Sequence, residues 1–236
     1  MPGLDLPADF PAAAHARVRE SVAGRTGARS GSAVESAGRE ARREFEGAWA
    51  ACAHRFLTLA RHDEAFTASL RRGGRHPEPA ALHAQEEALF GFVASGVAVA
   101  ESLGYALYAV AALVHPERYP IATPTDRRNA TLGATMRGYA ADFADEEITR
   151  VLFWRLNSHE FGWWKDVRAL LAHRSIPGRW PDEGGPEASV LHGAWMLRGE
   201  PVDDGTTARR RAWLAQSAAE LVAGTEGLVA RRLAER

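Results

Sequence analysis

Apolar side chains recur at helical spacing along most of this chain. Over residues 36–72 they follow one another in steps of three and four, which places them on one stripe of a helix. Asp63 falls on the same stripe. Because His62 and Glu64 flank it, we expect a local exit to solvent rather than a buried polar group. The apolar ladder consists of Phe45, Trp49, Cys52, Phe56, Leu59, Phe66 and Leu70.

A second helix is predicted over residues 79–114, and it is apolar on all sides. Glu101 is its only charged residue after Leu89. A run of this length is long enough to cross a bilayer. Its richness in Ala, Gly and Ser, and the arginine-rich segments on both sides, favour instead the central helix of a bundle. We therefore expect no membrane contact.

The rest of the chain carries shorter helical patterns separated by proline and glycine. Thr123 is predicted to be an N-cap, with Pro124 at the first helical position and Asp126 near the positive end of the helix dipole. Together the patterns predict an all-α, up-and-down bundle of four to five long helices. Further helices are expected at about 132–143, 151–156, 157–173 and 207–233, with a loop over 175–187 and a possible small β-hairpin over 190–202, before the last helix.

The N-terminal segment differs from the rest of the chain. Residues 1–32 mix Pro, Ala, Gly, Ser and Arg without apolar periodicity. We predict a mobile tail or a loosely docked arm there. Residues 33–236 are then expected to form a single helical-bundle domain.

Composition narrows the classes of function. The formal net charge is −1, so no global field attracts nucleic acid or an acidic membrane, and any nucleic-acid contact must use a local patch. Cys52 is the only cysteine, which excludes an intramolecular disulfide and suits a reducing compartment. The chain does not open with a basic segment followed by an apolar one, so we expect a cytoplasmic protein.

Motifs for several kinds of site are missing from the sequence. It contains no glycine-rich phosphate loop, no nucleophile elbow and no paired-cysteine zinc pattern. No glutamate stands three residues before a histidine, so the di-iron bundle signature is also missing. We therefore expect neither a metal ion nor a cofactor.

One motif carries candidate chemistry. Arg168 lies within an amphipathic helix, four residues separate it from His173 at the helix end, and a turn at Pro177-Gly178 follows. This arrangement resembles the HEPN family, whose motif is an arginine, four to six residues and a histidine near the end of a bundle helix. The resemblance implies a helical RNA-binding protein or a metal-independent endoribonuclease that acts as a homodimer. Other family members are catalytically silent and bind nucleotides or partner proteins.

The chemistry expected of these residues is coherent. Cleavage of RNA without a metal needs a base for the 2′-hydroxyl proton, an acid for the leaving oxygen and cations for the phosphorane. A histidine in the last turn of a helix can serve as acid or base near neutral pH, and an arginine offers a planar fork for phosphate oxygens. Arg168 and His173 are the candidate catalytic residues. Arg174 is expected to add charge at the substrate, and Glu101 and Ser102 are the remaining candidate substrate-binding residues.

Two alternatives stay open. Glu101, if buried, needs a partner, and a structural ion pair with Arg168 is favoured over a catalytic role. Arg168 and His173 can also be helix-end residues that satisfy free carbonyls and the dipole.

Ala169 stands where the family often has a polar residue, which favours a non-catalytic helical module that binds a ligand or a protein. Ser175, in place of a tyrosine, argues against the toxin branch of the family.

Overall fold

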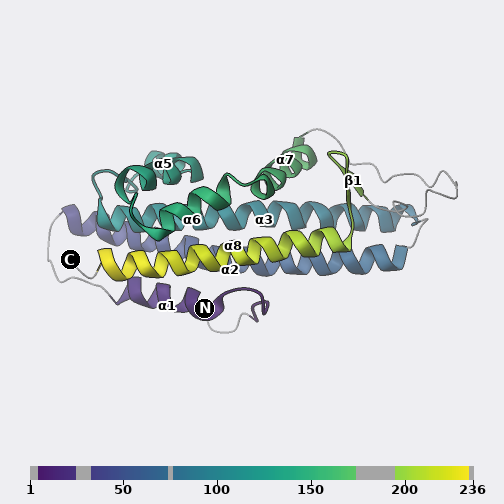
Figure 1. Ribbon diagram of the computed structural model, residues 1–236, viewed down its shortest axis with the longest axis horizontal. Coiled ribbons are helices and arrows are strands. Elements are labelled where there is room, and N and C mark those ends of the chain that lie inside the picture. The colour runs from purple at the N-terminus through teal and green to yellow at the C-terminus, as the bar shows by residue number, and fades with distance from the viewer. Residues whose placement is uncertain (1–4, 25–32, 74–76, 174–194, 234–236) are drawn as a thin grey trace. The chain divides into compact units, whose positions relative to one another are not determined.

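The computed structural model describes residues 5–24, 33–73, 77–173 and 195–233 (Figure 1). Within these ranges the chain forms helices and one two-stranded antiparallel hairpin, in which Trp195 pairs with Val202. This confirms the all-α bundle and the hairpin before the last helix, whereas the predicted loop over 175–187 lies outside the described residues. The elements are α1 Ala12–Ala23, α2 Ala33–Gly73, α3 Pro79–Val114, α4 Pro124–Asn129, α5 Leu132–Asp142, α6 Glu147–Leu156, α7 His159–His173, β1 Trp195–Leu197, β2 Glu200–Val202 and α8 Asp204–Arg232.

The chain divides into two compact units. Unit 1 comprises residues 1–54, 98–158 and 215–236, and unit 2 comprises residues 55–97 and 159–214. Three of the four boundaries fall inside α2, α3 and α8, so each of these long helices contributes one part to each unit, and the fourth falls between α6 and α7. The single domain expected over residues 33–236 stays a prediction.

The helix α1 corrects the prediction of a mobile tail over residues 1–32. In unit 1 the His15 ring stacks on Trp49 with 4.7 Å between ring centroids. His15 Nε2 donates to the Trp49 carbonyl at 2.8 Å, and the Trp49 indole donates to the His15 carbonyl at 2.9 Å. Phe10, Val18 and Val22 are buried as well. The tail prediction is therefore wrong for residues 12–23. The sequence pattern did not indicate this helix, because a histidine makes much of the contact that apolar residues at helical spacing usually make.

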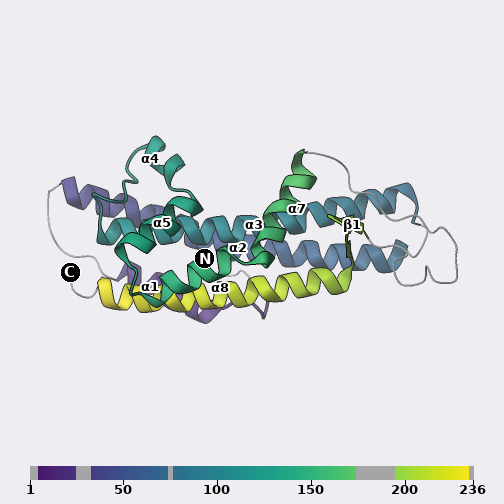
Figure 2. The same ribbon diagram turned by 45° about the horizontal axis from the view of Figure 1, so that its top comes forward.

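Close contacts between helices also order the rest of unit 1. The Thr135 hydroxyl donates to the Gly104 carbonyl at 3.0 Å, and the Tyr139 hydroxyl donates to the Leu107 carbonyl at 2.8 Å, which join α5 to α3. Thr123 is the N-cap of α4 and Pro124 lies in its first turn, as predicted. Thr123 and Asp126 also form a reciprocal capping box. The C-terminal part of α8 runs beside α6 in both views (Figures 1 and 2).

Unit 2 is built around buried aromatic and polar groups. Trp164 of α7 is fully buried, with its ring 5.0 Å from that of Phe92 of α3. A Cβ added at Gly96 would lie 2.2 Å from the same indole, so glycine is required for α7 to approach α3 this closely. The Gln85 side chain donates to the Ser69 carbonyl and accepts from the Trp195 indole, which ties α3 to α2 and to the hairpin.

The position of Asp63 corrects a second expectation. Asp63 is buried with 7% of its surface exposed, and Oδ2 lies 3.5 Å from Nη1 of Arg211 on α8. The expected exit to solvent is therefore wrong. The apolar stripe of α2 continues through this residue, and burial along the stripe outweighs the polar character of its neighbours.

The helix α3 meets the length and hydropathy of a membrane span, and 78% of its most apolar window is buried inside the structure. A central bundle helix has the same properties. Its composition is thus accounted for by packing, and the expectation of no membrane contact stays a prediction.

Candidate functional site

The inner face of α7 is fixed by aromatic packing. Trp163 is buried, and the Arg210 guanidinium from α8 lies 4.4 Å from the centroid of its ring. Arg210 also forms ion pairs with Glu160 at the start of α7 and with Glu200 of β2. Together with the buried Trp164, these contacts determine which side of α7 faces solvent.

The outer side of α7 carries two cations. Lys165, Asp166 and Arg168 are exposed, and Asp166 is paired with Arg198 from the β-hairpin turn. The Lys165 ammonium lies 5.3 Å from the centroid of the Phe161 ring. Within the described ranges, no carboxylate lies at ion-pair distance from Lys165 or Arg168. Positive charge is therefore available to an anion on this surface.

His173 is the last described residue of α7. Residues 174–194 lie outside the described part of the chain, so the predicted helix end stays a prediction. Five positions along an α-helix correspond to a rise of about 7.5 Å, and positions 168 and 173 are not neighbours on one stripe in the way that i and i+4 are. The long side chain of Arg168 would have to bridge this separation to share one phosphate with His173. The side chain of His173 and all of Arg174 lie outside the described part of the chain.

The predicted role of Glu101 needs correction. Glu101 of α3 is exposed, so it is not a buried carboxylate that requires an ion-pair partner. Glu101 lies in unit 1 and Arg168 in unit 2. Ser102 is buried, and its hydroxyl donates to the Ala98 carbonyl of its own helix at 2.8 Å. Because this helix is apolar on all sides, the sequence pattern did not indicate which of its sides faces solvent.

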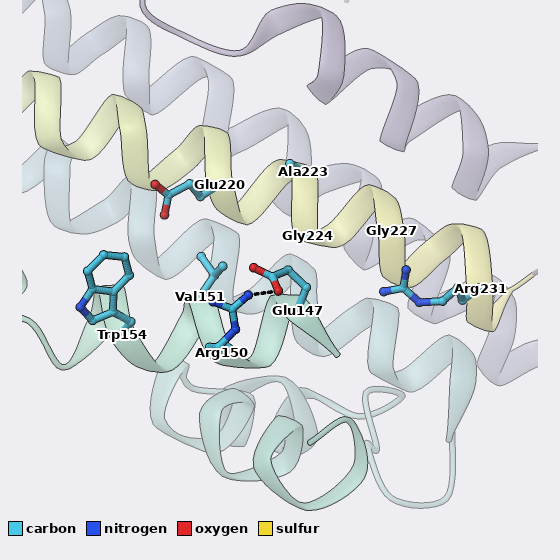
Figure 3. A pocket seen from close by; sticks show the side chains of 9 residues that line it. All are labelled: Glu147, Arg150, Val151, Trp154, Glu220, Ala223, Gly224, Gly227 and Arg231. Atoms are coloured by element: carbon cyan, nitrogen blue, oxygen red, sulfur yellow. Dashed lines mark hydrogen bonds and ion pairs between the residues drawn. The ribbon is translucent and has the colours of Figure 1, made fainter. Parts of the chain in front are cut away.

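Unit 1 has a groove between α6 and α8 (Figure 3). It encloses about 500 Å³, which is within the range of pockets that bind small molecules or inserted side chains. The two helices run antiparallel, with Trp154 at one end of the groove and Arg231 at the other. The groove is lined by Glu147, Arg150, Val151, Trp154, Glu220, Ala223, Gly224, Gly227 and Arg231.

The floor of this groove is set by a close helix contact. A Cβ added at Gly224 would lie 3.0 Å from the Cα of Ile148, so Gly224 lets α6 and α8 approach closely. Val151 is buried beside it, whereas Trp154 is 69% exposed. The Trp154 ring has the Arg155 guanidinium 5.0 Å from its centroid. The groove therefore combines a narrow apolar floor with a large aromatic side chain at its edge.

The charges around the groove are paired within unit 1. Glu147 pairs with Arg150, and Arg231 pairs with the buried Glu146. Hydrogen bonds from Arg155 lower the pKa of Glu220 from its ordinary value, against the opposing effect of burial. The groove edge thus presents both signs of charge, each already neutralised by a neighbour.

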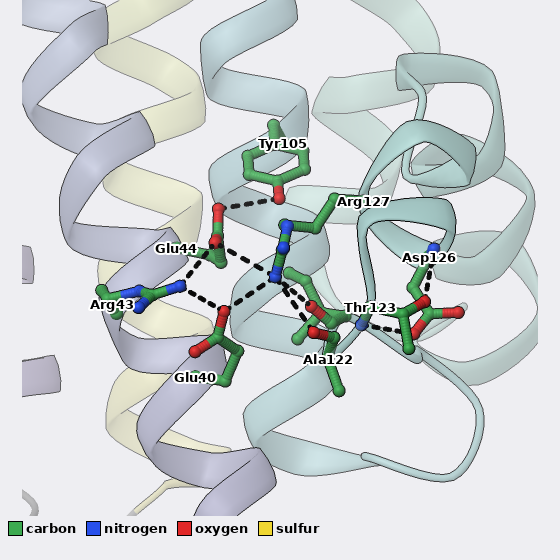
Figure 4. A network of polar contacts seen from close by, with 9 residues as sticks. Glu40, Arg43, Glu44, Tyr105, Ala122, Thr123, Asp126 and Arg127 are labelled. Atoms are coloured by element: carbon green, nitrogen blue, oxygen red, sulfur yellow. Dashed lines mark hydrogen bonds and ion pairs between the residues drawn. The ribbon is translucent and has the colours of Figure 1, made fainter.

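A second concavity of about 490 Å³ lies beside a polar network in unit 1 (Figure 4). Arg127 Nη1 contacts Glu40 at 2.8 Å and also donates to the Ala122 carbonyl. The Tyr105 hydroxyl donates to Glu44, and burial followed by this bond raises the pKa of Tyr105 well above its ordinary value. Because these groups satisfy one another and join α2 to α3 and α4, the network is structural.

Sequence reasoning missed the groove. Trp154 was assigned only to a helical pattern, and Ala223, Gly224 and Gly227 carry no recognisable motif. The one available signal was the spacing of Glu147, Arg150 and Trp154 by three and four positions, which places them on one side of α6. In the part of the chain that the structure describes, no group of three or more His, Cys, Asp or Glu side chains is placed to hold a metal ion.

Comparisons with known proteins add no family to this picture. No protein-family model matches the chain, and the searches of curated proteins and of solved structures gave no match. Function is therefore argued from the two surfaces described above.

Proposed function

We propose that this chain is a HEPN-like RNA-binding protein that can cleave RNA without a metal ion, with Arg168 and His173 at its site. The observation that supports this proposal is the exposed guanidinium of Arg168, which has no ion-pair partner among the described residues, on a helix that extends to His173. A guanidinium offers two parallel hydrogen bonds to a phosphate, and a histidine can exchange protons near neutral pH.

The proposal assigns distinct roles to these residues. Arg168 binds the phosphate and stabilises the charge that develops on it. His173 exchanges a proton with the 2′-hydroxyl or the leaving oxygen. Lys165, one helical turn before Arg168, adds a second cation on the same exposed side. Glu101 and Ser102 receive no role in this proposal, because Glu101 is not a buried carboxylate and the Ser102 hydroxyl is bonded to its own helix.

The test is cleavage of single-stranded RNA in the presence of a chelator. We expect His173→Ala to lower the cleavage rate at least about 100-fold, since a general acid or base contributes that much or more. Arg168→Ala should weaken RNA binding as well as cleavage. Arg137→Ala, an exposed arginine on α5, is the matched control and should behave as the wild type. Circular dichroism checks that each variant is folded.

Cleavage that persists in His173→Ala would remove the catalytic assignment. RNA binding that depends on Arg168, without cleavage by the wild type, would leave an RNA-binding protein. Absence of both would favour the second candidate.

The second candidate function is a non-catalytic helical module that binds a ligand or a protein. The groove between α6 and α8, with its exposed Trp154, is the observation that favours it. Aromatic side chains at the edge of a concavity are typical of binding surfaces.

A further inference from the structure

Trp154 is an unusual surface residue. Together with Phe90 it is one of two large hydrophobic side chains that are exposed in the described ranges, and it is the more exposed of the two, at 69% against 44%. An indole is among the side chains that contribute most to protein interfaces once it is buried in a partner's pocket. Trp154 also stands directly at the edge of the groove, whereas Phe90 does not line it.

The two ends of the groove differ in a complementary way. One end carries the Trp154 indole, and the other carries Gly227 with the Arg231 guanidinium lying across it (Figure 3). Arg231 is half exposed even though it pairs with Glu146. A guanidinium stacked on an indole is a favourable contact. If two grooves meet in antiparallel orientation, each indole end therefore faces a guanidinium end.

We propose that the groove between α6 and α8 is a homodimer interface, in which Trp154 of each copy packs over Gly227 and Arg231 of the other copy about a twofold axis. The contact is isologous, so the same residues act on both sides and the assembly closes as a dimer. The proposal rests on the groove alone and does not depend on the RNA site.

The glycines of α8 support this arrangement. Gly224 is required by the packing of α6 on α8, because its Cβ would meet the Ile148 backbone. A Cβ at Gly227 would meet only the guanidinium of Arg231, at 3.4 Å. The internal packing of unit 1 therefore does not require Gly227, although glycine inside a helix lowers helix stability. The space that it leaves open is on the groove side and accommodates an incoming aromatic ring.

The charges at the groove edge favour a second copy over other occupants. Glu147 and Glu220 are balanced by Arg150 and Arg231, so the edge has no net charge that would select a nucleic acid or a strongly basic protein. Mixed charges of both signs are complementary to themselves after a twofold rotation. A surface with one sign of charge would repel its own copy.

Analytical ultracentrifugation of the full chain over a concentration series tests the interface. We expect a monomer–dimer equilibrium for the wild type. Trp154→Glu should raise the dissociation constant at least about 30-fold, as expected for the loss of an interface hot spot. Gly227→Leu fills the other half of the contact and should have a similar effect. Phe90→Glu places the same charge on the other exposed aromatic residue and should leave the equilibrium unchanged.

A mixing experiment tests the twofold geometry. Each variant homodimer has two damaged contacts, but a mixed dimer of Trp154→Glu with Gly227→Leu keeps one intact contact, in which Trp154 of the second variant meets Gly227 of the first. The mixture should therefore associate more tightly than either variant alone. Thermal unfolding of both variants checks that they are folded.

Three outcomes would overturn the proposal. They are a wild type that stays monomeric, a Trp154→Glu variant with the wild-type dissociation constant, and a mixture no tighter than its components. RNA cleavage measured on the same samples separates this result from the proposed activity. Loss of the dimer with a retained His173-dependent activity, or the reverse, identifies which of the two proposals has failed.

Discussion

The groove of unit 1 and the outer side of α7 in unit 2 both carry arginines, but they use their charge differently. Around the groove, Glu147, Glu220 and Arg231 are each paired with a neighbour from the same unit. On α7, Asp166 is paired, whereas no ion pair of Lys165 or Arg168 is found among the described residues. A neutralised edge beside an exposed indole suits a protein surface, and unpaired cations suit a phosphate. A net charge of −1 hides this local difference.

The largest expected effect separates the two tryptophans of these regions. Trp164 of α7 is fully buried. Trp164→Ala should lower the free energy of unfolding by about 3–5 kcal/mol, because apolar surface is no longer buried and a cavity is left. Trp154→Ala removes a side chain that is mostly exposed, and it should change the free energy of unfolding of the monomer by no more than about 0.5 kcal/mol. Urea unfolding at a concentration low enough to keep the chain monomeric measures both. Equal losses would show that Trp154 is part of the core rather than of an interface.

The next effect concerns RNA binding. The double variant Lys165→Ala/Arg168→Ala should weaken the binding of single-stranded RNA, and it should reduce the slope of log K against log salt by about 0.7 for each phosphate that the variant no longer neutralises. Arg150→Ala, which removes a paired arginine at the groove, should leave the slope unchanged. Fluorescence anisotropy at several salt concentrations measures both variants. An equal slope for the double variant and the wild type would contradict a phosphate-binding role for α7.

The comparison also shows what the sequence could and could not predict. Periodicity located α2, and the length of an uninterrupted apolar run placed residues 79–114 with the bounds that the structure has for α3. The capping residues Thr123 and Asp126 were identified because helix starts have a local chemical signature. Local rules of this kind act over a few residues and can be recognised in one chain.

The expectations that failed depend on contacts between distant segments. Asp63 was expected at the surface from its neighbours, but its burial is decided by α8, which brings Arg211 to it from 148 positions along the chain. A buried Glu101 was considered because α3 lacks periodicity, and the pattern did not indicate its exposure. The exposure of Trp154 likewise depends on how α8 packs against α6. Surfaces made by two helices therefore could not be predicted from the pattern of a single helix. The candidate site on α7 could be proposed from the sequence because its motif lies within one predicted helix, and it stays a prediction.

A smaller effect is expected in acid, and only in unit 1. Burial lowers the pKa of His15 from its ordinary value of 6.5. The folded state then binds fewer protons than the unfolded state. This part of the stability is therefore complete above about pH 6.5 and is lost as the pH falls from that value through the lower pKa of the folded state. Hydrogen exchange in α1 should accelerate over this range, while amides of α7 around Trp164 should not respond. The acceleration should disappear in His15→Gln, and persistence there would assign it to another group.

The smallest expected effect is the most direct test of the contrast between paired and unpaired charge. Glu147 and Arg150 form an exposed pair, and such pairs contribute about 1 kcal/mol or less. Arg150→Ala should therefore change the dissociation constant of the dimer by less than about fivefold, whereas Trp154→Glu changes it much more. Sedimentation over one concentration series compares them. If Arg150→Ala weakened the dimer as much as Trp154→Glu, the charges at the groove edge would carry the association themselves. The groove would then bind through electrostatics, as the outer side of α7 is proposed to do, and the neutral edge would no longer distinguish the two surfaces.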